Sequence, residues 1–381
     1  MPAASILIKP ASSACNMACR YCFYHEIAAG RAVPDRGRMT DETLETLVRE
    51  AMSYAEGLVT FAFQGGEPTL AGLPFFRRAV ELERRYARPG LHVQNTIQTN
   101  GTLVDDEWAE FFHAHGFLVG LSIDGPERLN EAARVTAGGS GTHARVMRTA
   151  RILRKHGVEF NVLTVVTSHS ATRAGEIYRF MRKNHFDYLQ FIPCMSETPE
   201  HPNPWAVEPE AYGRFLCSLF DLWYPDFMAG QLVDIRFFSN LAQMAAGFAP
   251  EECGMCGRCT TYFAVESDGS VYPCDFYTAD EWRLGQVDDG LAALYASEAS
   301  RRFMEESAPK PTACRACPWF ALCRGGCRRW RDTARTGAAP DPELGRLGVN
   351  YLCEGYKLFF EHCADRIAVL GQIVRRNVYG R

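Results

Sequence analysis

The amino-acid sequence predicts an α/β protein: a partial barrel of six strand–helix units, followed by a small cysteine-rich domain and a C-terminal helix. Between about residues 5 and 195, short apolar runs alternate with longer amphipathic segments, which is the pattern of parallel strands joined by helices. Ten of the fifteen cysteines lie from Cys253 to Cys363. The stretch that begins near residue 354 has the pattern of a helix. The three predicted domains are residues 1–235, 236–365 and 366–381.

Six runs rich in β-branched or aromatic residues are predicted to be the strands, namely residues 5–10, 58–63, 92–98, 117–123, 160–166 and 188–193. Helical patterns separate them, such as residues 40–55, where Thr40 is a suitable N-cap. A further helix is expected over 208–230. Six strands make an open arrangement, because a closed barrel of this kind needs eight.

Composition excludes several classes of protein. The chain has 381 residues, of which 47% are hydrophobic, and a net charge of −4. We therefore expect no large basic surface for nucleic acid. No apolar run is long enough to cross a bilayer, and the N-terminus lacks a signal peptide. These features predict a cytoplasmic protein with no membrane partner, in which numerous thiols bind metal rather than form disulfides.

The first cysteine motif is "CNMACRYC", with cysteines at positions 15, 19 and 22. A structural zinc site needs four ligands, and iron–sulfur clusters normally take four cysteines. Three thiolates on a four-iron cluster leave one iron open to a ligand from outside the protein. Zinc binding or spare thiols are the alternatives. The loops after the next three predicted strands carry "QGGEPT", "QTNGT" and "DGPE", and the carboxyl ends of parallel strands meet at one mouth.

Eight of the ten cysteines in the second cysteine region, those other than Cys256 and Cys363, are enough for two fully ligated four-iron clusters. The last cysteine of a run such as "CRACPWFALCRGGC" ligates the other cluster in two-cluster ferredoxins. One predicted ligand set is therefore Cys253, Cys259, Cys274 and Cys327. The other predicted set is Cys314, Cys317, Cys323 and Cys353.

Alternatives to these sets remain at several cysteines. Any single CxxC could belong to a zinc ribbon. Cys256 could replace Cys253 or Cys259, although we expect it to be a bystander, and Cys363 is a rival to Cys353. The other two cysteines, Cys194 and Cys217, are interpreted as small buried apolar residues.

The combined motifs resemble the radical S-adenosylmethionine (SAM) superfamily with a SPASM extension, and within it the anaerobic sulfatase-maturating enzymes. The resemblance runs from residue 5 to about 365. It makes the barrel a partial (β/α)6 TIM-like barrel of the radical SAM type. The segments that carry it are "CNMACRYCFYHE", "FQGGEPTL", "QTNGTL", "LSIDGP", "VESDGSVYPCDFY", "WRLG", "CRGGCRR" and "NYLCEGYKLFF".

The resemblance implies SAM and three [4Fe-4S] clusters as cofactors, with Cys15, Cys19 and Cys22 holding the cluster that binds SAM. It also implies a set of SAM contacts. These contacts are Tyr21, Gly66, Glu67, Ser122, Arg134 and Met195. The alternatives are an ordinary turn for the GGEP segment, a surface arginine for Arg134 and a core methionine for Met195.

For the reaction, the resemblance implies an oxidoreductase that converts a cysteine or serine of a sulfatase peptide to formylglycine. Asp275 matches the catalytic base of the family, and Tyr24 and Gln64 match residues that line the substrate site. A flavodoxin- or ferredoxin-type reductant and a monomeric state are expected. A SPASM enzyme that crosslinks a ribosomal peptide is one alternative. A non-catalytic iron–sulfur electron carrier is another, which would have no use for an open iron.

Overall fold

Four parallel strands, β1 to β4, form the centre of the first of two units into which the chain divides. The computed structural model describes residues 3–196, 199, 202–337 and 339–379. The first unit consists of Met1–Ile123, Glu131–Asn161 and Thr261–Phe303, and the second of Asp124–Asn130, Val162–Thr260 and Met304–Arg381. In the described residues, no helix is long and apolar enough to cross a membrane.

The strands of the first unit follow the order β10-β9-β8-β1-β2-β3-β4. Their bounds are β1 Ala4–Ile8, β2 Leu58–Phe63, β3 His92–Thr99, β4 Leu118–Ser122, β8 Ala264–Val265, β9 Ser270–Tyr272 and β10 Gly285–Gln286. Strand β8 pairs in parallel with β1, whereas β9 and β10 are antiparallel to their neighbours. The pairs Ile8–Phe63 and Phe63–Ile97 are in register, so the carboxyl ends of the central strands lie at one edge.

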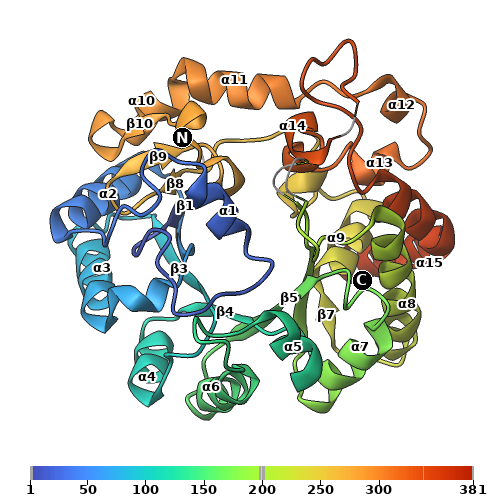
Figure 1. The fold of residues 1–381 in the computed structure, drawn as a ribbon, viewed down its shortest axis with the longest axis horizontal. Helices are drawn as coiled ribbons and strands as arrows, with labels where there is room; N and C mark the ends of the chain where they lie inside the picture. Colours follow the sequence, from blue (N-terminus) through green and yellow to red (C-terminus); the bar gives the residue numbers. More distant parts are fainter. Residues whose placement is uncertain (1–2, 197–198, 200–201, 338, 380–381) are drawn as a thin grey trace. The chain divides into compact units, whose positions relative to one another are not determined.

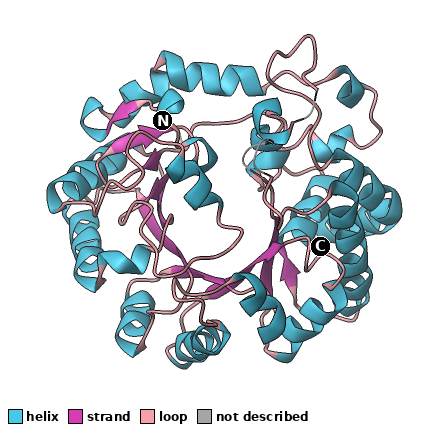
Figure 2. Cartoon of the chain, viewed as in Figure 1, coloured by secondary structure: helices cyan, strands magenta, loops and turns pink. Residues whose placement is uncertain are grey.

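Helices cover the outer side of β1 to β4 (Figures 1 and 2). The helices of the first unit are α1 Phe23–Ala29, α2 Asp41–Tyr54, α3 Leu73–Arg85, α4 Asp106–Ala114, α6 His143–Lys155 and α10 Leu291–Ala296, with 3-10 turns at Pro68–Ala71, Asp275–Tyr277, Asp280–Trp282 and Val287–Asp289. The predicted N-cap of α2 is present, because Thr40 Oγ1 accepts a hydrogen bond of 3.2 Å from the backbone N–H of Thr43.

Aromatic side chains fill the space between these helices and the strands. Phe76 on α3 packs edge-on against Phe63 of β2, with ring centroids 4.9 Å apart. It also contacts Trp108 of α4 at 5.2 Å. Phe76 and Phe112 are fully buried, so this cluster fixes α3 and α4 on the strands and leaves the strand ends free to carry polar loops.

The second unit has its own parallel strands and a core of three helices. Strand β6 (Tyr188–Pro193) pairs with β5 (Phe160–Val166), most of which lies in this unit, and with β7 (Asp234–Ile235). The remaining helices of this unit are α7 Ala174–Lys183, α8 Pro209–Met228, α9 Arg236–Ala245, α12 Thr312–Arg315, α13 Phe320–Cys323, α14 Thr333–Thr336 and α15 Cys353–Tyr379, with 3-10 turns at Cys253–Met255 and Arg328–Trp330. Helices α5 (Glu127–Ala133) and α11 (Glu298–Ser307) have residues in both units.

Close backbone contact joins α8 and α15. A Cβ added to Gly213 of α8 would lie 2.5 Å from the carbonyl oxygen of Gly355, so only glycine allows the two helices to approach this closely. Phe220, Phe238 and Phe359 then pack together from α8, α9 and α15, with ring centroids 5.0 to 5.9 Å apart.

All six predicted strands are present, and the bounds of β2, β5 and β6 are those predicted. The helices expected over 40–55, over 208–230 and from about 354 correspond to α2, α8 and α15. Four two- or three-residue strands, β7 to β10, were not predicted, because such short segments carry no recognisable periodicity. The domain bounds at 235 and 365 stay a prediction.

A buried carboxyl group makes the stability of the first unit depend on pH. Glu83 of α3 is 6% exposed and accepts a 2.9 Å hydrogen bond from the side-chain amide of Asn95 on β3. Burial raises its pKa to about 7, although the Asn95 hydrogen bond acts in the opposite direction. The folded state therefore holds a proton between about pH 4.5 and 7 that the unfolded chain releases, so the free energy of unfolding falls as pH rises through this range.

We predict that Glu83→Gln removes this pH dependence, since glutamine fills the same space without charge. At pH 8 the variant should be more stable than the wild type by about 2–3 kcal/mol, with little difference at pH 4.5. Anaerobic denaturant titrations at both pH values measure this. The exposed Glu81 on the same helix provides the control Glu81→Gln, and equal pH slopes for Glu83→Gln and the wild type would contradict the prediction.

Candidate functional site

The loop that carries the first three cysteines follows β1 and is held on both sides by backbone hydrogen bonds. The N–H groups of Ala18 and Arg20 donate to the carbonyls of Val135 and Ala133, at 2.8 and 3.0 Å. On the other side, the N–H of Glu67 donates to Ala14 at 2.8 Å. The three cysteines are therefore fixed at the carboxyl edge of the central strands, as the sequence predicts.

The thiols of Cys15 and Cys22 in this loop are close enough for one to change the pKa of the other. Burial raises the pKa of Cys15 to about 11, and nearby Cys22 adds to the rise. Burial also raises the pKa of Cys22, while the backbone N–H groups of Tyr24 and His25, at the start of α1, act against it. Asn100, directly after β3, approaches the Cys15 sulfur with its side-chain amide at 3.9 Å. Clustered thiols with hydrogen-bond donors around them fit a cluster ligated by thiolates.

Gly66 lies directly against the cysteine loop. Its φ is +54°, and a Cβ at this position would collide with the carbonyl oxygen of Ala14 and come within 2.9 Å of that of Ser12. Both the conformation and the lack of space require glycine.

Glu67 is turned inward, where it joins the loops after β2 and β3. The side chain is 1% exposed. One carboxylate oxygen accepts hydrogen bonds from the hydroxyls of Thr69 and Thr99, at 2.6 and 2.7 Å, and the other accepts from the N–H of Asn100 at 2.8 Å. Burial raises its pKa, and these donors oppose the rise. Glu67 thus holds the strand-end loops together, and its predicted contact with SAM stays a prediction.

Three further residues predicted to contact SAM belong to the first unit. The guanidinium of Arg134 lies over the ring of Tyr21, 5.6 Å from its centroid, and its positive charge lowers the pKa of Cys22 against the larger effect of burial. Ser122, at the end of β4, accepts a 2.9 Å hydrogen bond from Gln98. The last predicted SAM contact, Met195, belongs to the second unit, where it is buried.

Tyr24, Gln64 and Asp275 form a hydrogen-bonded cluster, although the chain separates the first and last by 251 residues. The hydroxyl of Tyr24 donates to Asp275 Oδ2 at 2.5 Å. The side-chain amide of Gln64 contacts the Tyr24 oxygen at 2.8 Å and the same carboxylate oxygen at 3.3 Å. Burial raises the pKa of Tyr24 well above its usual value, and the nearby carboxylate adds to this, so the hydroxyl stays a donor.

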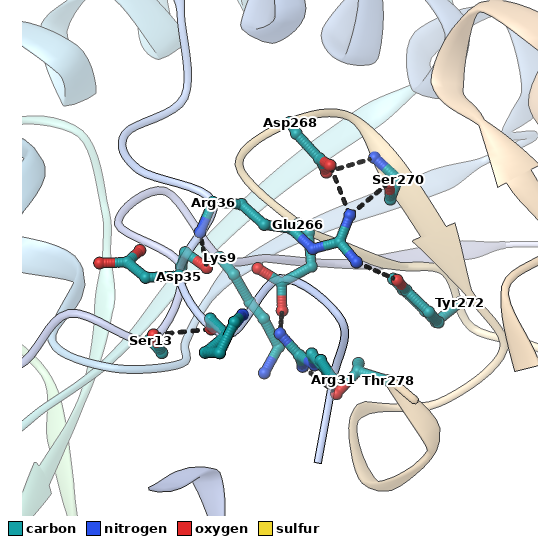
Figure 3. Close-up of polar contacts among 12 residues, drawn as sticks. Lys9, Ser13, Arg31, Asp35, Arg36, Glu266, Asp268, Ser270, Tyr272 and Thr278 are labelled. Atoms are coloured by element: carbon teal, nitrogen blue, oxygen red, sulfur yellow. Dashed lines mark hydrogen bonds and ion pairs between the residues drawn. The ribbon is translucent and has the colours of Figure 1, made fainter. Parts of the chain in front are cut away.

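A second set of polar contacts fixes the turn that carries Asp275 (Figure 3). The buried Arg31 guanidinium, just after α1, forms an ion pair of 2.7 Å with Glu266 and donates to the Thr278 hydroxyl at 2.5 Å. Arg36 contacts Asp268, Ser270 and Tyr272 along the β8–β9 hairpin at 2.5 to 3.0 Å. The segment that follows the first cysteine motif is therefore bound to the segment that carries Asp275.

The cysteines of the second unit lie near one another in two groups, while the predicted ligand sets stay a prediction. Cys327 interacts electrostatically with Cys253 and Cys259, whereas Cys323 interacts with Cys314, Cys317 and Cys353. Burial raises the pKa of Cys323 to about 12, and the other thiols of its set add to this. Cys274 belongs to the first unit.

The chemistry of these thiols fits the clusters that the sequence predicts. Each thiolate of a four-iron cluster binds a different iron, and each of the two groups supplies neighbouring thiols. Among the described residues, no three His, Cys, Asp or Glu side chains are close enough to hold one metal ion.

The remaining four cysteines are not among the predicted ligands. Cys363 on α15 hydrogen-bonds with Cys217 on α8, and both are buried. Cys256 is exposed, and its sulfur lies 3.7 Å from the carbonyl oxygen of Glu252. Cys194 is buried, as the sequence suggests.

Comparison with known proteins identifies the family. Residues 10–181 match the radical SAM superfamily, and residues 253–318 match the SPASM iron-sulfur cluster-binding domain. A cysteine-type anaerobic sulfatase-maturating enzyme of Clostridium perfringens is 45% identical over 96% of this chain and 98% of that protein. The chain belongs to the anaerobic sulfatase-maturating enzyme family.

Other relatives agree with this assignment. A serine-type anaerobic sulfatase-maturating enzyme of Bacteroides thetaiotaomicron is 34% identical over 94% of this chain and 89% of that protein. The solved structure of native anSMEcpe with bound AdoMet and Cp18Cys peptide has a TM-score of 0.91 and 42% identity, covering 98% of this chain and all of that one. The predicted fold class is thereby confirmed, as are the predicted enzyme class and its cofactors, SAM and iron–sulfur clusters.

Sequence reasoning missed two residues of the site, Lys9 and Asn100. Lys9 is the first residue after β1 and lies 2.9 Å from Asp275. A lysine directly after an apolar strand that leads into the cysteine motif is a signal that could have identified it. Asn100 occupies the corresponding position after β3, within the predicted loop "QTNGT", but nothing in that loop indicates a contact with Cys15.

We predict that Gly66→Ala displaces the first cysteine loop and lowers the iron content by about a third, the share of one of three clusters. SAM cleavage should fall with it. Iron analysis and 5′-deoxyadenosine formation under anaerobic reduction measure both. Gly90→Ala is the matched control, because Gly90 has a φ of +78° but open space around its Cβ position. Equal iron loss in both variants would mean that backbone strain, not the contact with Ala14, is responsible.

Proposed function

We propose that this enzyme oxidises a cysteine of a sulfatase polypeptide to Cα-formylglycine. The support for cysteine over serine is similarity: three cysteine-type relatives are 40 to 45% identical, and three serine-type relatives are 34% identical. The observation that carries the proposal is the cluster of Tyr24, Gln64 and Asp275 at the strand edge that also holds the first cysteine loop.

The reaction removes two hydrogens from the cysteine side chain, one as an atom and one as a proton plus an electron. When bound, SAM with its cluster supplies a radical that takes the first hydrogen from the β-carbon, and the other clusters supply an acceptor for the electron. Loss of the proton gives a thioaldehyde, which water converts to the aldehyde with release of hydrogen sulfide. Serine would give the aldehyde directly.

Asp275 is the proposed base for that proton. The carboxylate is 6% exposed, and the donors Tyr24 and Gln64 face its Oδ2. Since a base must lie within hydrogen-bond reach of the proton it removes, a carboxylate held in one orientation is better suited than a mobile one. Tyr24 and Gln64 also line the space in which we expect the substrate peptide.

We propose that the cofactors bind to the residues predicted from the sequence. Cys15, Cys19 and Cys22 would hold the SAM cluster, and SAM would contact Tyr21, Gly66, Glu67, Ser122, Arg134 and Met195. The two additional clusters would use Cys253, Cys259, Cys274 and Cys327, and Cys314, Cys317, Cys323 and Cys353. We further propose a monomeric, cytoplasmic enzyme reduced by a flavodoxin- or ferredoxin-type protein and without a nucleic-acid partner.

Mass spectrometry of sulfatase peptides after anaerobic turnover tests the activity. We expect the mass of the cysteine peptide to change by the loss of hydrogen sulfide and the gain of one oxygen atom, and the matching serine peptide to lose two hydrogens more slowly or not at all. Omission of SAM is the control. A crosslinked product would instead support a peptide-crosslinking enzyme, and the absence of both product and 5′-deoxyadenosine would support an electron carrier.

We predict that Asp275→Asn retains SAM cleavage but lowers the rate of formylglycine formation by about 100-fold or more, because asparagine keeps the shape and cannot accept the proton. Parallel assays of 5′-deoxyadenosine and formylglycine measure the two steps. Asp106→Asn, at a surface aspartate paired with Lys155, is the control. Formylglycine formation at the wild-type rate would remove Asp275 from the mechanism.

A further inference from the structure

Lys9 is a buried cation to which the proposed mechanism gives no role. It follows β1 directly and is 2% exposed, although lysine is among the residues least often buried. Its backbone is fixed by a 2.9 Å hydrogen bond to the carbonyl of Val265 in β8. A buried ammonium group is costly unless a partner compensates for the lost hydration, so its surroundings indicate what it does.

Two residues of the candidate site surround the ammonium group. Lys9 Nζ lies 2.9 Å from Asp275 Oδ1 and 4.1 Å from the centroid of the Tyr24 ring. Among the described residues, Asp275 Oδ1 accepts no hydrogen bond, so its contact with Lys9 is an ion pair. The cation therefore acts through its charge, on the carboxylate and on the face of the aromatic ring at once.

The two oxygens of Asp275 consequently have different surroundings. Oδ2 faces the donors Tyr24 and Gln64, and Oδ1 faces Lys9. Rotation of the carboxylate about its Cβ–Cγ bond would separate both oxygens from their partners. The three neighbours together hold the group in one orientation.

Because Gly65 has no side chain, the side chain of Lys9 has room to reach this position. A Cβ added to Gly65 would lie 2.7 Å from Lys9 Cγ and 3.1 Å from its Nζ. The backbone there has a φ of +100°, which also favours glycine. The first glycine of the "QGGEP" segment thus leaves room for the lysine, whereas the second leaves room for the cysteine loop.

We propose that Lys9 is a positioning residue for the base: its ammonium holds the Asp275 carboxylate in the orientation that removes the substrate proton. This rests on the proposed function. Without the cation, the carboxylate would rotate or move away from its place, and hydrogen abstraction would proceed without timely loss of the proton. The consequence is uncoupling, in which 5′-deoxyadenosine forms without an equal amount of formylglycine.

The test is the ratio of formylglycine to 5′-deoxyadenosine in Lys9→Met, which keeps the length of the side chain and removes its charge. We expect this ratio to fall about tenfold, with iron content, cluster absorption and the KM for a cysteine peptide unchanged. A merely structural defect would lower both products together and leave their ratio as it is. Lys155→Met is the matched control, because Lys155 pairs with Asp106 at the surface.

Lys9→Arg and Lys9→Gln separate charge from shape. Arginine keeps the charge and should retain most of the coupling, whereas glutamine should behave like methionine. A neutral variant with wild-type coupling would overturn the proposal, as would an arginine variant as uncoupled as the methionine one. If the neutral variants do not assemble clusters, the arginine variant decides, since a ratio below half of the wild-type value would overturn the proposal. Absence of formylglycine from the wild type would instead reject the proposed function.

Discussion

The parallel pairing of β8 with β1 is the contact on which the arrangement of the first unit depends. It joins Ile8 to Val265 in register, and so brings the chain that follows residue 265 beside the loop that follows residue 8. The cysteine motif and Lys9 come from the first of these segments, and Asp275 comes from the second. The two residue pairs between β1 and β8 thus hold these two segments side by side. Without them, contacts between mobile loops would have to do so.

Two buried ion pairs also hold together the segments that the strand pairing brings side by side. The Arg31–Glu266 pair is almost fully buried on both sides, and the Lys9–Asp275 pair nearly so. Pairs of this kind add little net stability, because desolvation offsets much of their attraction. Their value is geometric: each charge has one partner in one place, which makes alternative arrangements of the two segments costly. This is the precision that proton transfer at a single carboxylate requires.

Sequence reasoning predicted the regular part of the fold well, because six long strands and their helices carry clear periodicity. The two cysteine ligand sets stay a prediction. Family resemblance singled out Tyr24, Gln64 and Asp275, and the structure brings these three side chains together in one hydrogen-bonded cluster. Sequence reasoning could not predict strands β7 to β10, which have two or three residues each, or the inward turn of Glu67. These depend on tertiary contacts, such as the pairing of β8 with a strand more than 250 residues earlier, that no local pattern records.

The same pairing affects how the chain acquires its structure. During synthesis, β1 emerges before its neighbour β8, which leaves the ribosome only after residue 265 has been made. Until then one edge of β1 lacks its hydrogen-bonding partner and is open to pairing with other strands. Closing so long a loop is slow compared with local folding. The N-terminal strand therefore reaches its final state late, after most of the polypeptide is available, and a chain cut before β8 would keep that edge exposed.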